Sequence, residues 1–107
     1  MNREQKKIQA QVNGEILKAI DVFDKYNVNG LKGDISRLRC CTAWVYTSPR
    51  YRTLVSYRTI VAFIDLENGT GYDILRYVYG YTSTSAQHIS KFFHDYAAQR
   101  IMRYYEI

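Results

Sequence analysis

The best candidates for a reactive or anion-binding site are His88 and the hydroxyl side chains that precede it. The run Thr82–Ser85 precedes this histidine at the start of a predicted helix. Free backbone amides and the helix dipole at such a start attract phosphate, so Thr84 and His88 form a candidate polar site. The same residue types also cap helices, and Thr84 with Gln87 matches a capping box. In that second interpretation, His88 packs against the end of the sheet.

The other reactive residues do not form a catalytic or metal-binding pattern. His88 and His94 are six residues apart, whereas two metal ligands on one helix face need a spacing of three or four. Asp65, Glu67 and Asp73 flank a predicted exposed turn, which lacks the shielding that shifts a catalytic carboxyl pKa. We therefore expect no enzymatic activity, no metal and no cofactor.

Cysteine usage and hydropathy indicate the cellular compartment. Cys40 and Cys41 are adjacent and make a poor disulfide pair, which favours a reducing cytosolic environment. The first residues lack the apolar core of a signal peptide, and no run approaches the roughly 18 apolar residues of a membrane span. We therefore expect a cytoplasmic protein without a membrane partner. The length of 107 residues predicts a single domain, 1–107.

Arginine and aromatic residues share a segment, Ile35 to Ile64, that contains no acidic residue. The net charge of +5 favours anionic partners. Arginine, tyrosine and tryptophan are enriched in protein hot spots and also suit stacked bases and phosphates. Three explanations of this segment remain open: it binds a protein partner, it binds a nucleic acid, or its arginines only solvate an exposed sheet face. The predicted partner-binding residues are Arg37, Arg39, Arg50, Tyr51, Arg52, Tyr57, Arg58, Arg76, Tyr77, Tyr79 and Tyr81.

Helical periodicity defines both ends of the domain. Apolar residues spaced by three or four predict a helix from about Asn2 to Asn27, with Gly14 as a candidate kink, and a loop up to residue 33. Its apolar face contains Ile8, Val12, Ile16, Ile20 and Phe23. A second apolar stripe predicts a helix over 83–98, and the tail after it extends this helix or adds an edge strand.

The residues between the helices predict an antiparallel sheet within 40–81. Cys40–Thr47 reads as a strand, and Asp34–Arg39 as a short helical turn. The segment from Thr53 to Asp65 reads as one bulged strand or two short ones, apolar on both faces and therefore central, with Ile60, Ala62 and Ile64 on one face. Asn68 and Gly69 predict a tight hairpin.

The last predicted strand runs from Tyr72 to Tyr81 and places Leu75, Tyr77, Tyr79 and Tyr81 on one face. The whole pattern predicts an α+β fold: an N-terminal helix, an antiparallel sheet of three to four strands, and a C-terminal helix packed on the sheet.

The segment Leu54–Phe93 resembles a family of small uncharacterised bacteriophage proteins. Their shared core is an SY-T-VA strand, a hairpin, a second strand and an S-TT--H---F helix. The matching positions are Ser56, Tyr57, Thr59, Val61, Ala62, Tyr81, Ser83, Thr84, His88 and Phe92. The resemblance implies a phage or prophage accessory protein with no enzymatic activity and no cofactor. Small phage proteins of this size often look like inhibitors of host machinery, anti-CRISPR proteins among them.

Together these observations predict a phage-encoded binding protein that acts in the host cytoplasm. We expect it to inhibit a host defence complex, a protein or ribonucleoprotein such as a CRISPR effector, through its basic arginine and tyrosine surface. The alternative is a small basic accessory protein that binds nucleic acid. Tyrosine-rich sheet faces favour self-association, so a homodimer is a further expectation.

Overall fold

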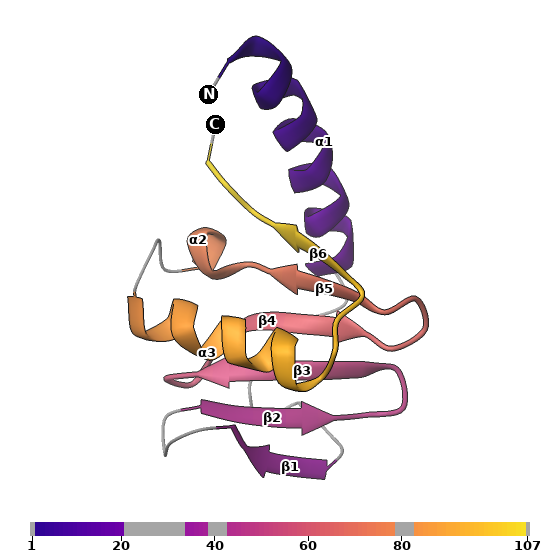
Figure 1. Cartoon of the computed structure of the whole chain (residues 1–107), viewed down its shortest axis with the longest axis vertical. Coiled ribbons are helices and arrows are strands. Elements are labelled where there is room, and N and C mark those ends of the chain that lie inside the picture. The colour runs from indigo at the N-terminus through magenta and orange to yellow at the C-terminus, as the bar shows by residue number, and fades with distance from the viewer. Residues whose placement is uncertain (1, 21–33, 39–42, 79–82, 107) are drawn as a thin grey trace.

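A computed structural model describes residues 2–20, 34–38, 43–78 and 83–106. Within them, six strands form one sheet whose spatial order follows the sequence, β1 to β6 (Figure 1). The elements are α1 (Arg3–Ile20), β1 (Asp34–Arg37), β2 (Ala43–Thr47), β3 (Tyr51–Ser56), β4 (Thr59–Asp65), β5 (Thr70–Asp73), α2 (Leu75–Val78), α3 (Ser83–Asp95) and β6 (Arg100–Arg103). The α+β prediction is confirmed, although the sheet has more strands than the predicted three to four.

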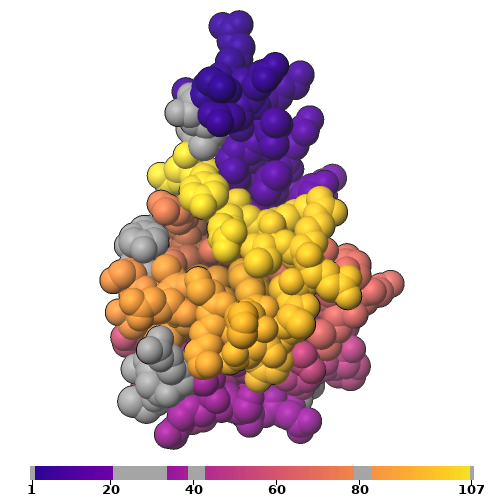
Figure 2. All heavy atoms as spheres, in the orientation of Figure 1, coloured from indigo at the N-terminus to yellow at the C-terminus, as the bar shows by residue number. Residues whose placement is uncertain are grey.

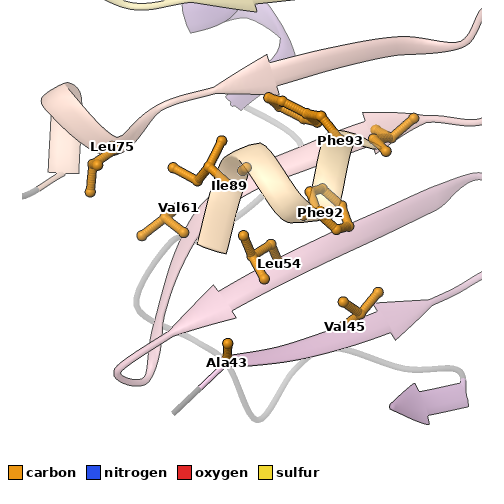
Figure 3. Close-up of a cluster of buried hydrophobic side chains, with 10 residues drawn as sticks. Ala43, Val45, Leu54, Val61, Leu75, Ile89, Phe92 and Phe93 are labelled. Atoms are coloured by element: carbon orange, nitrogen blue, oxygen red, sulfur yellow. The ribbon is translucent and has the colours of Figure 1, made fainter. Parts of the chain in front are cut away.

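The two longer helices pack on opposite faces of this sheet. Leu54 and Val55 are neighbours on β3, so their side chains point to opposite faces. Leu54 lies in the buried cluster with Ile89 and Phe92 of α3 (Figure 3), whereas Val55 lies in the cluster with Ile16 of α1. The central strand β4 is buried at every position, as its two apolar faces predict.

The N-terminal helix is longer than the surface that it covers. A reciprocal capping box begins it, because Gln5 N–H donates to Asn2 Oδ1 at 2.9 Å and Asn2 N–H donates to Gln5 Oε1 at 3.0 Å. The helix continues through Gly14. Ile16 is fully buried, yet Ile8 on the same stripe is 60 % exposed, because α1 projects beyond the sheet (Figure 1). The predicted helix end at Asn27 lies outside the described residues.

Two short strands, rather than one bulged strand, form the centre of the sheet. The turn between β3 and β4 contains Tyr57 and Arg58, whose φ angles of 50° and 67° are those of a two-residue hairpin turn. A bulge also occurs, since the register shifts between Leu54 and Val55. It places Val61 and Ala62 together on the α3 side, while Ile60 joins the α1 side, so the expected grouping of Ile60 with Ala62 is wrong.

Two predicted segments have a different structure. The expected helical turn after Asp34 is the edge strand β1. The strand expected from Tyr72 to Tyr81 ends at Asp73, where the Oδ1 atom accepts a hydrogen bond from Leu75 N at 3.1 Å and α2 begins. This turn lets Ile74 and Leu75 bury their side chains in the two different clusters, which overrides the strand propensity of the tyrosines.

The hairpin between β4 and β5 is confirmed but wider than predicted. Its loop spans residues 66–69, and Gly69 N donates to Asp65 O at 2.8 Å. Gly69 has a φ of +73°, whereas Asn68 does not have the positive φ that a tight Asn-Gly turn requires.

The C-terminal helix ends at Asp95, three residues before the predicted residue 98, in a left-handed cap. Ala97 has a φ of 51°, and Ala98 N donates to Phe93 O at 3.1 Å while Ala97 N donates to His94 O at 3.3 Å. These bonds form a Schellman motif.

The tail then becomes an edge strand, the second of the two predicted alternatives. Strand β6 pairs with β5 in parallel, after the crossover through α3, whereas the other strand pairs of the sheet are antiparallel. The helix α1 holds the tail in place, because Gln9 Nε2 donates to Arg103 O at 2.9 Å and Asn13 Nδ2 donates to Tyr105 O at 2.7 Å.

Candidate binding surface

Arg37 and Trp44 form the centre of the candidate surface. They are direct cross-strand neighbours on β1 and β2, and the Arg37 guanidinium lies 5.0 Å from the centre of the indole ring. Such a cation–π pair holds the planar cation flat on the ring and leaves its edge available for a partner. Ile35, two residues before Arg37 and opposite Tyr46, is 58 % exposed on the same face. An exposed aliphatic side chain thus lies beside the cation.

Toward the middle of the sheet, half-buried Tyr51 packs on the aromatic core beneath this surface. Tyr51 on β3 meets Phe63 edge to face at 6.1 Å, and Phe63 stacks on Tyr72 at 4.8 Å. Burial raises the pKa of Tyr72 above its ordinary value, and the negative charge of Asp65 is the second-largest cause. We refer to Ile35, Arg37, Trp44, Tyr46 and Tyr51 as the aromatic face. It lies on the side opposite α3, so it is turned away from the viewer in Figure 2.

Arg50 is on the β2–β3 turn and is engaged by two carboxylates. Its Nη2 lies 3.2 Å from Glu67 Oε2 and 3.7 Å from Asp65 Oδ2. Asp65 itself is buried rather than exposed as expected, and its Oδ1 accepts from Glu67 N at 3.0 Å. Arg50 therefore has two anionic partners within the molecule, while its side chain stays largely exposed.

Arg52 lies on the other side of the sheet from the aromatic face. Its guanidinium stacks on Tyr96 at 4.6 Å, next to the end of α3. Tyr96 in turn shares a hydrogen bond of 3.3 Å with Ser36 of β1. The Nε atom of Arg52 is buried and has no hydrogen-bond partner among the described residues. Arg52 therefore joins α3 to the sheet through its packing rather than through ion pairing.

Four further predicted residues lie apart from the aromatic face. Arg58 and Tyr57 are exposed in the β3–β4 turn. Arg76 belongs to α2, where its guanidinium lies 4.8 Å above the ring of Tyr105 in the C-terminal tail. Tyr77, also on α2, meets Tyr104 edge to face at 5.2 Å.

The predicted helix-start site divides into one exposed and one buried residue. Helix α3 begins at Ser83, so Thr84 lies in its first turn and is exposed. His88 is 3 % exposed, and its Nδ1 lies 3.3 Å from Ser56 Oγ on β3. Ser56 Oγ also bonds to Ser85 Oγ at 3.0 Å. His88 thus packs against the sheet, as in the second interpretation of this segment.

The structure consequently separates the predicted residues into several places. Arg37 and Tyr51 lie on the aromatic face, and Arg52 lies on the opposite one. Arg39, Tyr79 and Tyr81 lie outside the described residues. Ile35 and Trp44 were absent from the predicted binding set. Once β1 is recognised as a strand, Ile35 shares a face with Arg37 because it lies two residues before it, and Trp44 lies opposite Arg37 on β2.

The described residues contain neither a cluster of metal-ligating side chains nor a helix that could span a membrane. No three histidine, cysteine, aspartate or glutamate side chains come together there as a metal site. No helix in the described part of the chain is long and apolar enough to cross a bilayer. No protein family, curated protein or solved structure matches the sequence.

Proposed function

We propose that this protein is a non-enzymatic binding protein that docks on a protein partner through its aromatic face. The observation that carries the proposal is the stacked pair of Arg37 and Trp44, with exposed Ile35 beside it. Arginine and aromatic anchors next to an apolar contact are the composition of protein hot spots. The overall positive charge would speed encounter with an acidic partner surface.

The distribution of arginines favours a protein over a nucleic acid. Binding to a nucleic-acid backbone relies on a row of cations that replaces counterions along the phosphates. Here Arg50 is compensated by Asp65 and Glu67, and Arg52 packs on the opposite side of the sheet. The aromatic face carries one arginine, Arg37, beside exposed Ile35, a combination that suits a small protein contact better than a row of phosphates.

The narrower role that the sequence predicts belongs to the same proposal. The protein would be a phage-encoded inhibitor of a host defence complex, such as an RNA-guided nuclease, and would meet it in the host cytoplasm. Support for this role comes from the resemblance of Leu54–Phe93 to small phage proteins. The alternative, a phage accessory protein that binds nucleic acid, is one outcome of the experiment below.

The test compares substitutions on the aromatic face with one elsewhere. Tagged wild-type protein is used to capture its partner from host extract, and the affinity for the purified partner is then measured. Ile35→Asp and Arg37→Glu change exposed side chains of an edge strand, so the fold should persist. We expect each to weaken binding by about tenfold or more, as hot-spot changes do. Lys18→Glu, an exposed charge reversal on α1, is the control and should bind like the wild type.

A salt titration with generic DNA and RNA completes the test. Steep loss of wild-type binding between about 50 and 200 mM salt would favour the nucleic-acid alternative. Unchanged affinity of both aromatic-face variants for the captured protein would contradict the proposed docking surface.

A further inference from the structure

A small polar cavity lies at the far end of the sheet from the aromatic face. It is lined by residues from the ends of β5 and β6, from α2 and α3, and from the C-terminal tail, and it has a volume of about 110 Å³. Buried Leu75 forms part of its lining. The polar side chains that line it are Asp73, Arg76, Ser90, Arg103 and Tyr105. These residues come from five elements, β5, α2, α3, β6 and the C-terminal tail, so only folding brings them together.

The cavity contains more positive than negative charge. Two guanidinium groups, those of Arg76 and Arg103, line it with a single carboxylate, that of Asp73. The Asp73 Oδ1 atom accepts from Leu75 N, and its Oδ2 atom lies 3.5 Å from Arg103 Nε. A guanidinium has five N–H donors, and this long contact occupies one nitrogen of Arg103. The carboxylate therefore does not occupy every N–H donor of Arg103.

Both arginines are positioned by the fold. The ring of Tyr105 supports Arg76 from below at 4.8 Å. The backbone of Tyr105 is held by Asn13 of α1, whose Nδ2 donates to its carbonyl at 2.7 Å. Arg103 belongs to the paired strand β6, opposite Asp73. These contacts restrict both side chains, which lowers the entropic cost of binding.

We propose that this cavity binds a small oxyanion, a phosphate or a carboxylate group, between Arg76 and Arg103. The planar fork of arginine matches two oxygens of such a group, and the Ser90 hydroxyl is a further donor in the lining. Burial raises the pKa of Asp73, although the charges of Arg103 and Arg76 oppose this shift. The site is separate from the aromatic face and does not depend on the function proposed for it.

Titration of the ¹⁵N-labelled full chain by NMR tests this site. Sodium phosphate and sodium acetate are the two probes, and sodium chloride at matched ionic strength is the reference. We expect saturable shifts at the Ser90 and Arg103 amides with at least one probe. Saturation by phosphate alone would identify a phosphate group as the ligand, and saturation by acetate alone would identify a carboxylate. Shifts no larger than those with chloride would overturn the proposal.

Single substitutions make the test specific. Arg76→Gln and Arg103→Gln should each weaken binding by about tenfold, because each removes a charge-assisted hydrogen bond. Asp73→Asn should tighten it, since this change removes the competing carboxylate while its side-chain carbonyl can still accept from Leu75 N. Arg58→Gln, an equal charge change in the β3–β4 turn, at a residue that does not line the cavity, should leave binding unchanged. The same spectra report whether each variant is folded. Weaker binding by Asp73→Asn, or equal loss in Arg58→Gln, would refute the site.

Discussion

Ser56 on β3 and His88 on α3 share a buried hydrogen bond of 3.3 Å between Oγ and Nδ1. The Ser85 hydroxyl completes the group at 3.0 Å from Ser56 Oγ. These polar atoms lie beside the apolar cluster that attaches α3 to the sheet, where an unmatched polar group would be costly. The arrangement fixes the position of α3 along the strand more specifically than apolar packing alone can.

Replacement of His88 should destabilise the protein. His88→Ala removes a buried ring and its hydrogen bond, so we expect the free energy of unfolding to fall by about 2–4 kcal/mol. Thr84→Ala, an exposed change on the same helix, should alter it by less than about 0.5 kcal/mol. Urea unfolding followed by circular dichroism measures both. Equal stability of the two variants would argue against a structural role for His88.

Substitution of two glycines by alanine should have opposite effects. A Cβ atom at Gly71 on β5 would lie 2.7 Å from Cε1 of buried Phe93, so Gly71→Ala should cost about 1–3 kcal/mol of stability. A Cβ atom at Gly14, inside α1, meets no atom within 4 Å. Gly14→Ala should therefore stabilise the protein by about 1 kcal/mol through helix propensity. Thermal unfolding measures whether each variant is more or less stable than the wild type. A stabilising Gly71→Ala would contradict the close approach of α3 to β5.

The C-terminal cap of α3 offers another stabilising change. Ala97 adopts a left-handed conformation that costs a residue with a Cβ atom about 1–2 kcal/mol and costs glycine little. Ala97→Gly should consequently raise the melting temperature. Ala10→Gly, at an exposed position inside α1, is the matched control and should lower it, because glycine disfavours a helix interior. A lower melting temperature for both variants would show that Ala97 is not in the capped geometry.

Asp73 should make stability fall with rising pH in the acid range. Burial raises the pKa of its carboxyl above the ordinary value of 3.8, so the folded protein holds this proton more tightly than the unfolded chain does. This contribution to stability is fully present below pH 3.8 and is lost as the pH rises through the folded pKa. Removal of the carboxyl in Asp73→Asn should abolish this loss.

Urea titrations at a series of pH values measure the effect. The free energy of unfolding of Asp73→Asn, relative to wild type, should rise with pH by at most about 1.4 kcal/mol per unit. Glu106→Gln, a change of an exposed carboxyl in the tail, should run parallel to the wild type. A parallel profile for Asp73→Asn would contradict the burial of this carboxyl.

The central elements could be predicted from the sequence because their burial is periodic. The apolar stripe with Ile16 defines α1, and the stripe with Phe92 defines α3. The edge strands carry no comparable signal. All four residues of β1 are exposed, and of β6 only Met102 is buried. Exposed strands of this length do not need alternating hydrophobicity, which is why β1 was expected to be a helical turn.

The arginine surface could be predicted only in part, because charge compensation depends on tertiary structure. The segment that lacks acidic residues ends at Ile64, yet Asp65 and Glu67 lie beside Arg50 across the hairpins. Strand alternation separates Arg52 from Tyr51, and the sequence does not show which face α3 covers. A charge reversal of Arg50 and Arg52 would therefore disturb internal contacts as well as any partner contact.

The hydrogen bonds from Gln9 and Asn13 to the tail imply an order of events during synthesis. Their partners, the carbonyls of Arg103 and Tyr105, lie 94 and 92 residues later in the chain. Helix α1 leaves the ribosome first, yet it cannot complete its docking until this tail has been translated. Ile16 and Ile20 are apolar and pack against residues of β3 and β4, so the nascent chain carries an uncovered stripe at least until these strands have been translated. These two hydrogen bonds between α1 and the tail should therefore form late in folding.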